Sequence, residues 1–224
     1  MKRSSPESAF TLLELLVVMG IIIIALAALV PAVTSLSKSG GRRAARNSLL
    51  GGIEQARAEA IKSAQPTYVV FATFPPPPPS TAQSTLDRYN YRSYAIFEND
   101  AATGIAKQLT DWKSFPTGVA LRATGTAALS NLPTWAPPPS FTFTPDATAS
   151  PVFRCFQFGS NGEVQAPTAD VLVGIFEGYV NNGSEVATTK DGSGNPSAVE
   201  YITVSQFTGR AVPANPVPTP TPGP

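Results

Sequence analysis

The chain has 224 residues, of which 42% are hydrophobic and only 14% charged, and its formal net charge is +1. This length suffices for one membrane segment and one globular domain, and the near-neutral charge gives no general attraction to nucleic acid. Histidine is absent and Cys155 is the only cysteine, which excludes an internal disulfide and most metal and acid–base schemes. We therefore expect no enzyme, no cofactor and no metal site, and we expect Cys155 to be a buried residue of a strand.

The chain begins with a short basic segment, residues 1–9, followed by an apolar run over 10–33 in which Glu14 is the only charge. A helix over this run would be about 36 Å long, and the hydrocarbon core of a bilayer is about 30 Å thick. The pattern predicts a transmembrane helix over 10–33.

A secretory signal peptide is the main alternative, because Ala25-Leu26-Ala27 follows an apolar run as a cleavage site would. However, Glu14 lies within the run, the run continues to Val30, and helix-compatible sequence resumes after Pro31. These features favour a retained helix.

A carboxylate such as Glu14 is costly in an apolar spanning segment and indicates a function with a specific partner. A cut between Ala9 and Phe10 would create an α-amino group one helical turn away. The amine of the same chain could pair with Glu14. The amine of a neighbouring copy would also select the stagger between helices.

The stretch "AFTLLELLVVMGIIIIALAALVP" closely resembles the N-terminal signature of type IV prepilins and type II secretion pseudopilins. The resemblance implies cleavage by prepilin peptidase between Ala9 and Phe10, N-methylation of Phe10 and a role for Glu14 in subunit assembly. Pro31 falls where many of these proteins carry a helix-kinking proline. The protein is then expected in the bacterial inner membrane, single-pass with an extracytoplasmic C-terminal domain, and in a filament after processing.

Two features depart from this family's pattern. Ala9 replaces the usual glycine before the cut, and since alanine is also small we expect processing, at a lower rate. The positive-inside count alone would invert the topology, because Lys38, Arg42, Arg43 and Arg46 follow the helix while the leader has two basic residues.

Helical spacing continues over 34–66, where an apolar stripe predicts an amphipathic helix that covers a sheet. The stripe comprises Leu49, Ile53, Ala56 or Arg57, Ala60 and Ile61. Pro66 is expected to stop the helix, and the pairs Gly40-Gly41 and Gly51-Gly52 to mark bends. The basic patch of Lys38, Arg42, Arg43 and Arg46 is expected to contact lipid headgroups or acidic groups of adjacent subunits, or to remain solvated.

Residues 67–212 read as a β-rich domain, because segments rich in β-branched and aromatic residues alternate with turn residues and no crossover helix intervenes. The sequence thus predicts an α+β fold, one long helix on antiparallel sheet. Residues 213–224 are expected to be a proline-rich flexible tail. The expected strands are 67–74, 91–97, 118–123, 140–144, 152–158, 170–178 and 199–207.

This second half resembles the H-type minor pseudopilins and their FimT-like relatives, through "FQFGSNGEV" and the closing "ITVSQFTGRAV". In that branch a strand ending in Gly-Arg commonly closes the domain, which here is Gly209-Arg210. Trp112 and Trp135 are interpreted as core or domain-edge anchors.

The function expected from these resemblances is that of a pilin-like structural subunit of a type II secretion or type IV pilus-type filament. Its expected partners are other pilin or pseudopilin subunits, prepilin peptidase, an inner-membrane assembly platform and membrane lipid. The alternative is a membrane-tethered minor pilin that binds DNA or another ligand, with Arg210 as a DNA contact. The tail after Arg210 has no lysine or arginine, which disfavours DNA.

Overall fold

The computed structural model describes residues 12–74, 88–99, 106–137, 143 and 152–214, without the side chains of residues 26–39. The chain divides into two compact units, Met1–Gly40 and Gly41–Pro224.

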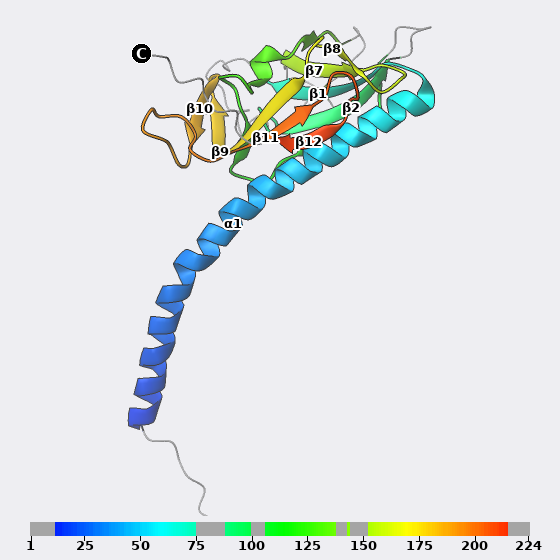
Figure 1. Ribbon diagram of the computed structural model, residues 1–224. Coiled ribbons are helices and arrows are strands. Elements are labelled where there is room, and N and C mark those ends of the chain that lie inside the picture. The colour runs from blue at the N-terminus through cyan, green and yellow to red at the C-terminus, as the bar shows by residue number, and fades with distance from the viewer. Residues whose placement is uncertain (1–11, 75–87, 100–105, 138–142, 144–151, 215–224) are drawn as a thin grey trace, which may run out of the picture. The chain divides into compact units, whose positions relative to one another are not determined.

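A single helix, α1, spans Leu12–Ser63 (Figure 1). The helix predicted before residue 33 and the amphipathic helix predicted after it are therefore one uninterrupted element, which passes through Pro31. It ends at Ser63, shortly before Pro66 as predicted. The Ser63 hydroxyl donates to the Glu59 carbonyl oxygen (2.9 Å) and accepts from the Gln65 N–H (3.2 Å), which satisfies polar groups where the helix ends.

The glycine pairs do not interrupt α1, and two of the glycines allow close packing instead. A Cβ on Gly52 would overlap the ring of Tyr94, and one on Gly41 would lie 3.3 Å from Val119 Cγ2. The Tyr94 hydroxyl donates to the Ser48 carbonyl oxygen of the helix at 2.6 Å. Burial raises the pKa of Tyr94, so this hydroxyl remains a donor at neutral pH. Gly41 and Gly52 were predicted to mark bends, but the absence of a side chain at these positions instead lets residues of the sheets pack closely against the helix.

The first sheet has the order β3-β2-β1-β7-β6, with β4 paired to β2 and β8 to β7, and all of its pairs are antiparallel. Its strands are β1 (Thr67–Thr73), β2 (Ser93–Asn99), β3 (Ala106–Gln108), β4 (Lys113–Ser114), β6 (Thr134–Trp135), β7 (Val152–Phe158) and β8 (Val164–Ala166).

The second sheet has the order β10-β9-β11-β12, with β5 also paired to β9, and is antiparallel throughout. Its strands are β5 (Val119–Leu121), β9 (Val171–Asn181), β10 (Ser184–Ala187), β11 (Val199–Val204) and β12 (Ala211–Ala214), and a short 3-10 helix, η1, covers Leu129–Asn131. Asn182 and Gly183 form the two-residue β9–β10 turn with φ of 50° and 74°, as a hairpin turn of this length requires.

The predicted α+β class and antiparallel pairing are confirmed, and β7 has the predicted bounds. The strand predicted over 199–207 was too long, because β11 ends at Val204 and a turn follows. The prediction over 140–144 lies outside the described residues except for Phe143. Six short strands were not predicted, because two to four residues carry too little periodicity; they are β3, β4, β6, β8, β10 and β12.

The main core lies between α1 and both sheets. Leu49, Ile53, Ala56 and Ala60 of the helix are fully buried against residues of both sheets, while Ile61, predicted in the same stripe, is 46% exposed. Ile61 lies one position beyond Ala60, which rotates it away from the buried face.

A second core covers the opposite face of the first sheet. Its aromatic residues include Phe97, Trp112, Trp135 and Phe153, which confirms the interpretation of both tryptophans as core anchors. Cys155 also lies here, buried in β7 as predicted. Burial raises the pKa of its thiol to about 12, so Cys155 remains protonated and unreactive at neutral pH.

Candidate functional site

The residues expected to direct processing and assembly lie at the N-terminal end. Ala9 and Phe10 are outside the described residues, as is the side chain of Pro31. Glu14 lies in the first turn of α1 with an exposed side chain. A carboxylate in this turn is favoured by the partial positive charge of a helix N-terminus.

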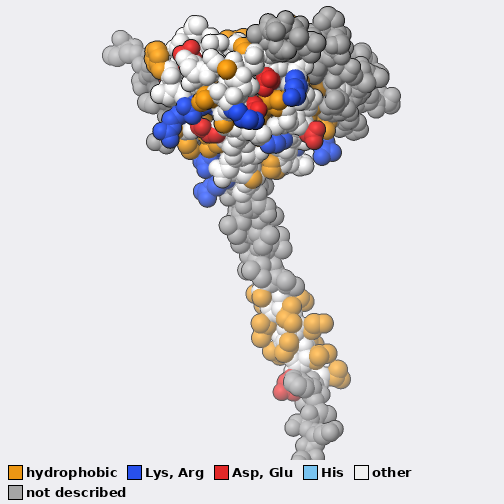
Figure 2. Space-filling model, turned by 90° about the vertical axis from the view of Figure 1, so that its right-hand side faces the viewer, with side chains coloured by type: hydrophobic (Ala, Val, Ile, Leu, Met, Phe, Trp, Pro, Cys, Tyr) orange, Lys and Arg blue, Asp and Glu red, His pale blue; other side chains and the backbone are white. Residues whose placement is uncertain are grey.

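Around Glu14 the helix exposes apolar side chains on all sides. From Leu12 to Ile24 the large hydrophobic residues are 46–87% exposed. Figure 2 shows these side chains covering the described part of the N-terminal unit. A helix that is apolar all round needs an apolar environment outside its own fold. Within the described residues, no helix has a long enough apolar stretch to span a membrane.

The basic patch has two kinds of member. Arg42 and Arg46 are largely buried against the second sheet, whereas Arg43 is exposed; the side chain of Lys38 is outside the described residues. A helix turns by 100° per residue, so positions 42 and 46 share the face toward the sheet and position 43 does not.

Arg42 and Arg46, which face the second sheet, each form an ion pair with an acidic residue of that sheet. Arg42 Nε lies 3.4 Å from Glu177 Oε1 of β9, and Arg46 Nη1 lies 2.9 Å from Glu200 Oε2 of β11. Within the described part of the chain, neither Arg42 Nε nor Glu200 Oε2 has a hydrogen-bond partner, so the attraction in each pair is that of two charges. Arg42 Nη1 also donates to the Ala198 carbonyl oxygen at 2.9 Å. These pairs hold the helix to the sheet electrostatically, in addition to the apolar core.

Arg210 is exposed, in the turn between β11 and β12. The expectation that a strand ending in Gly209-Arg210 closes the domain was wrong in detail, because both residues precede the last strand. That strand, β12, includes Pro213 and Ala214, which were assigned to the tail. Proline is tolerated there because β12 is an edge strand.

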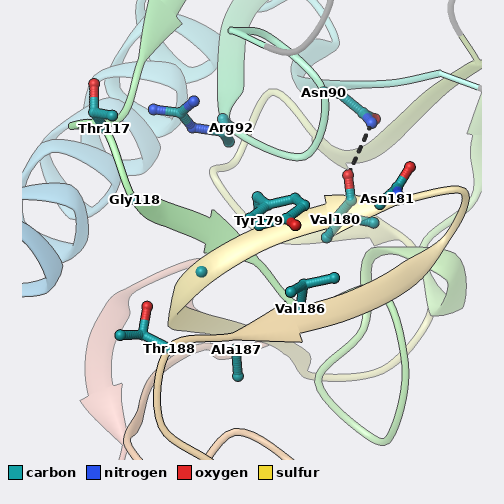
Figure 3. A pocket seen from close by; sticks show the side chains of 11 residues that line it. Asn90, Arg92, Thr117, Gly118, Tyr179, Val180, Asn181, Val186, Ala187 and Thr188 are labelled. Carbon is teal, nitrogen blue, oxygen red and sulfur yellow. Dashed lines mark hydrogen bonds between the residues drawn. The ribbon is translucent and has the colours of Figure 1, made fainter.

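A pocket of about 590 Å³ opens beside the β9–β10 hairpin (Figure 3). Tyr179 and Val180 of β9 form one side, and Arg92 and Asn90 lie opposite them. The Asn90 side-chain amide donates to the Val180 carbonyl oxygen at 3.4 Å. The described residues of its lining include no carboxylate, histidine or cysteine, so the pocket offers shape and hydrogen bonds without an acid–base pair.

Arg122 and Glu185 form a buried ion pair that fixes the hairpin beside this pocket. Glu185 Oε1 accepts from Arg122 Nε (2.8 Å) and from the backbone N–H groups of Ala123 (2.7 Å) and Thr124 (2.9 Å). A buried carboxylate with three donors is well satisfied. Its role is structural.

Sequence reasoning missed Glu177 and Glu200 as partners of the basic patch. A signal was present, since Glu177 follows four apolar or small residues of a predicted strand. An acidic group in such a buried strand requires a cation. The identity of that cation depends on how α1 packs against the sheet, and the sequence pattern does not specify this packing.

Two family models match the chain. The model for the type II transport protein GspH matches residues 45–174, more than half of the chain, and the model for the prokaryotic N-terminal methylation motif matches residues 4–30. The second match contains Ala9, Phe10 and Glu14.

Two solved structures that are similar to this chain are distant from it in sequence. The type IV minor pilin FimU of Pseudomonas aeruginosa is 12% identical over 79% of this chain and 90% of its own, with a TM-score of 0.40. The minor pseudopilin EpsH of Vibrio cholerae is 15% identical over 82% of this chain and 99% of its own, also with a TM-score of 0.40. No curated protein matches the chain.

Proposed function

We propose a mode of assembly for this chain, which belongs to the family of the type II transport protein GspH and is a pilin-like subunit of a type II secretion or type IV pilus-type filament. In this mode a membrane-held precursor is trimmed at its N-terminus, and the apolar part of α1 then moves from lipid into the packed helices of the filament.

The first step is the cut between Ala9 and Phe10 by prepilin peptidase. The methylation motif spans this bond, which supports the assignment of Phe10 as the new, N-methylated first residue. Removal of residues 1–9 takes away Lys2 and Arg3, so the leader charges no longer hold that end at the cytoplasmic face.

The observation that carries this proposal is the ring of exposed apolar side chains on α1 around a single carboxylate. Apolar surface exposed on every side of a helix is stable only in lipid or against other apolar helices. Lipid provides this environment for the stored precursor in the inner membrane, and neighbouring subunits provide it in the filament. We assign a single membrane pass with the domain on the extracytoplasmic side, and the match to the methylation motif supports this orientation.

Glu14 directs the packing of those helices. A charge in an apolar surrounding is stabilised when an opposite charge lies close by. The α-amino group of Phe10 on a neighbouring subunit supplies that charge, and pairing of Glu14 with it selects one stagger among the many that apolar surfaces alone would permit.

Two residues of the basic patch, Lys38 and Arg43, are assigned to contacts with the lipid surface or with other subunits. Arg43 is exposed, and Lys38 lies nearer the apolar segment in the sequence. We assign these two residues to anionic headgroups or to acidic groups on adjacent subunits, and Arg42 and Arg46 to the helix–sheet contact first. The assembly platform of the inner membrane is the further partner of the trimmed subunit.

DNA capture is the alternative function. Arg210 is the exposed cation that would serve it, and a single cation on a near-neutral chain gives weak attraction to phosphates. The subunit role therefore accounts for more of the molecule.

Mass spectrometry of the N-terminus of the mature native protein tests the proposal. We expect the first residue to be Phe10, carrying an N-methyl group. A mature chain that retains residues 1–9 would contradict the proposal, because no amine would exist beside Glu14. A mature chain that begins at Ala28 would instead indicate signal-peptide cleavage after Ala27.

A further inference from the structure

The turn Ser205–Arg210 between β11 and β12 is held by several elements of the domain. Within the turn, the Gly209 N–H donates to the Ser205 carbonyl oxygen (2.8 Å) and the Ser205 N–H to that of Arg210 (3.1 Å). From α1, Arg57 Nε donates to the Thr208 carbonyl oxygen at 2.8 Å. The helix and the turn are thus directly bonded.

Two further contacts fix the turn from its other side. The Gln206 N–H donates to Asp170 Oδ1 at 2.7 Å, and the Gln206 carbonyl oxygen accepts from the Val164 N–H at 2.8 Å. Gly209 has a φ of +62°, and a Cβ there would overlap the carbonyl oxygen of Gly162. The backbone of the turn therefore has one well-defined conformation, with a glycine that no other residue replaces without strain.

This fixed turn presents an aromatic ring to solvent. The side chain of Phe207 is 85% exposed, although its neighbours Val204 and Gly209 are buried. Gly162, which packs against Gly209 of the turn, also lies close to the side chain of Ile61 on α1. The side chains of Ile61 and of Val212 on β12 are each about half exposed. A single exposed apolar residue is ordinary, but a phenylalanine presented to solvent by a turn whose backbone is held in one conformation suits a binding anchor.

The charged residues of the elements that contact this turn differ in whether they already have a partner. Glu54 accepts from the Ala211 N–H (3.0 Å) and lies 3.8 Å from Arg57, Glu59 pairs with Lys62, and Asp170 accepts from Gln206. Among the described residues, Arg210 has no ion pair. A complementary surface would therefore offer an apolar hollow for Phe207 and a carboxylate for Arg210.

The outer edge of β12 excludes one mode of binding. The Ala211 N–H is occupied by Glu54, and Pro213, two residues on and facing the same edge, has no N–H to offer. Such an edge resists the addition of another strand. Binding here must proceed through side chains.

We propose that Phe207 and Arg210 anchor this domain to the domain of a neighbouring pilin-like subunit, with Phe207 in an apolar hollow and Arg210 on a carboxylate at its rim. This inference rests on the proposed function, since it needs a filament in which domains adjoin. The rigid turn favours such a contact because little conformational entropy remains to be lost when it forms.

Photo-crosslinking of the full-length chain in its own bacterium tests the proposal. A benzoyl-phenylalanine replaces Phe207, and in a matched control it replaces Tyr179, which is 53% exposed on β9 away from this turn. We expect the probe at position 207 to form an adduct with a chain that carries the N-terminal methylation motif, and mass spectrometry identifies that chain. The probe at position 179 should give at least fivefold less of this adduct, because an anchor contacts the partner and a peripheral position does not.

Several results would overturn the docking surface: equal adducts at both positions, no adduct at 207, or adducts at 207 only with an exported protein or DNA. Methylation of Phe10 and filament incorporation are measured in the same cells. If both are intact without the adduct, only this inference fails, and if methylation is lost in the unmodified chain, the proposed function itself fails.

Substitution provides a second readout. Phe207→Ala should reduce co-purification of neighbouring subunits by roughly tenfold, as loss of an aromatic anchor does, and Tyr179→Ala should leave it unchanged. Arg210→Glu should also reduce it, since it reverses the charge offered to the partner. The melting temperature of each variant is measured in parallel. If Phe207→Ala loses co-purification because the domain no longer folds, the result counts against the proposal.

Discussion

The two ends of α1 use apolar residues in different ways. From Leu12 to Ile24 the large hydrophobic side chains are exposed around the whole helix, whereas from Ala45 to Ala60 the helix buries one stripe and leaves polar residues outside. The first end needs partners outside its own fold. The second is satisfied within its own domain. One continuous helix can therefore serve as a filament element and as a structural element of a domain, provided that its apolar pattern changes along its length.

Polar residues follow the same division. Glu14 lies among exposed apolar side chains, and its proposed partner is on another subunit. Arg42 and Arg46 meet Glu177 and Glu200 within the domain. Loss of the first contact should affect assembly and leave folding intact, and loss of the second should affect folding first.

The largest expected effect is that of Glu14→Leu. Because the proposed pairing with the Phe10 amine would be lost while apolar character increases, we expect membrane insertion to continue and incorporation into filaments to be abolished. Incorporation is measured by fractionation and immunoblotting of sheared filaments. The control is Glu59→Gln, which removes an acidic group from the part of α1 that belongs to the domain. Normal incorporation of Glu14→Leu would remove the role assigned to this carboxylate.

Leu49→Ala should produce the largest loss of domain stability. Leu49 is fully buried against both sheets, and truncation of a buried leucine costs about 2–5 kcal/mol. For a domain of this size each kcal/mol lowers the melting temperature by roughly 2–4 °C. The matched control is Ile61→Ala on the same helix, where half of the side chain is already exposed. Equal losses at both positions would contradict the assignment of the buried face.

The adjacent glycines of α1 should respond in opposite directions. Gly52→Ala places a methyl group against the Tyr94 ring and should destabilise the domain by about 1–3 kcal/mol. Gly51→Ala has open space and should stabilise it by about 0.5–1 kcal/mol through helix propensity. Thermal unfolding of the full chain in detergent measures both. A stabilising Gly52→Ala would show that the ring does not lie against the helix.

The smallest expected loss of stability is that of Arg42→Met. It leaves Glu177 without its cation in a nearly buried site, and because the pair retains some contact with solvent we expect a loss of about 1–2 kcal/mol. Arg43→Met, on the exposed side of the helix, should leave stability unchanged. Adding Glu177→Gln to Arg42→Met should recover part of the loss, and a purely additive double variant would exclude the pairing.

The reliable predictions from sequence came from long periodic patterns. Strand β7 was predicted with its bounds, and the burial of Leu49, Ile53 and Ala60 followed from helical spacing. Errors arose where a neighbouring element decides the outcome. Gly52 suggested a bend because its sequence shows only the absence of a side chain, whereas its role depends on the Tyr94 ring from another strand. The strand expected to reach residue 207 ended at Val204, because contacts from Arg57 and Asp170 stabilise a turn there.

The sequence by itself determined that this chain has an apolar N-terminal helix with one carboxylate, a methylation motif and an antiparallel β-rich domain, because these features depend on residues close together along the chain. Only the tertiary structure decided that Arg42 and Arg46 face acidic residues of the second sheet, that glycine in α1 admits a tyrosine ring, and that Phe207 is held rigidly in solvent. Each of these depends on residues far apart in sequence, and local patterns carry no record of which distant partner a side chain will meet.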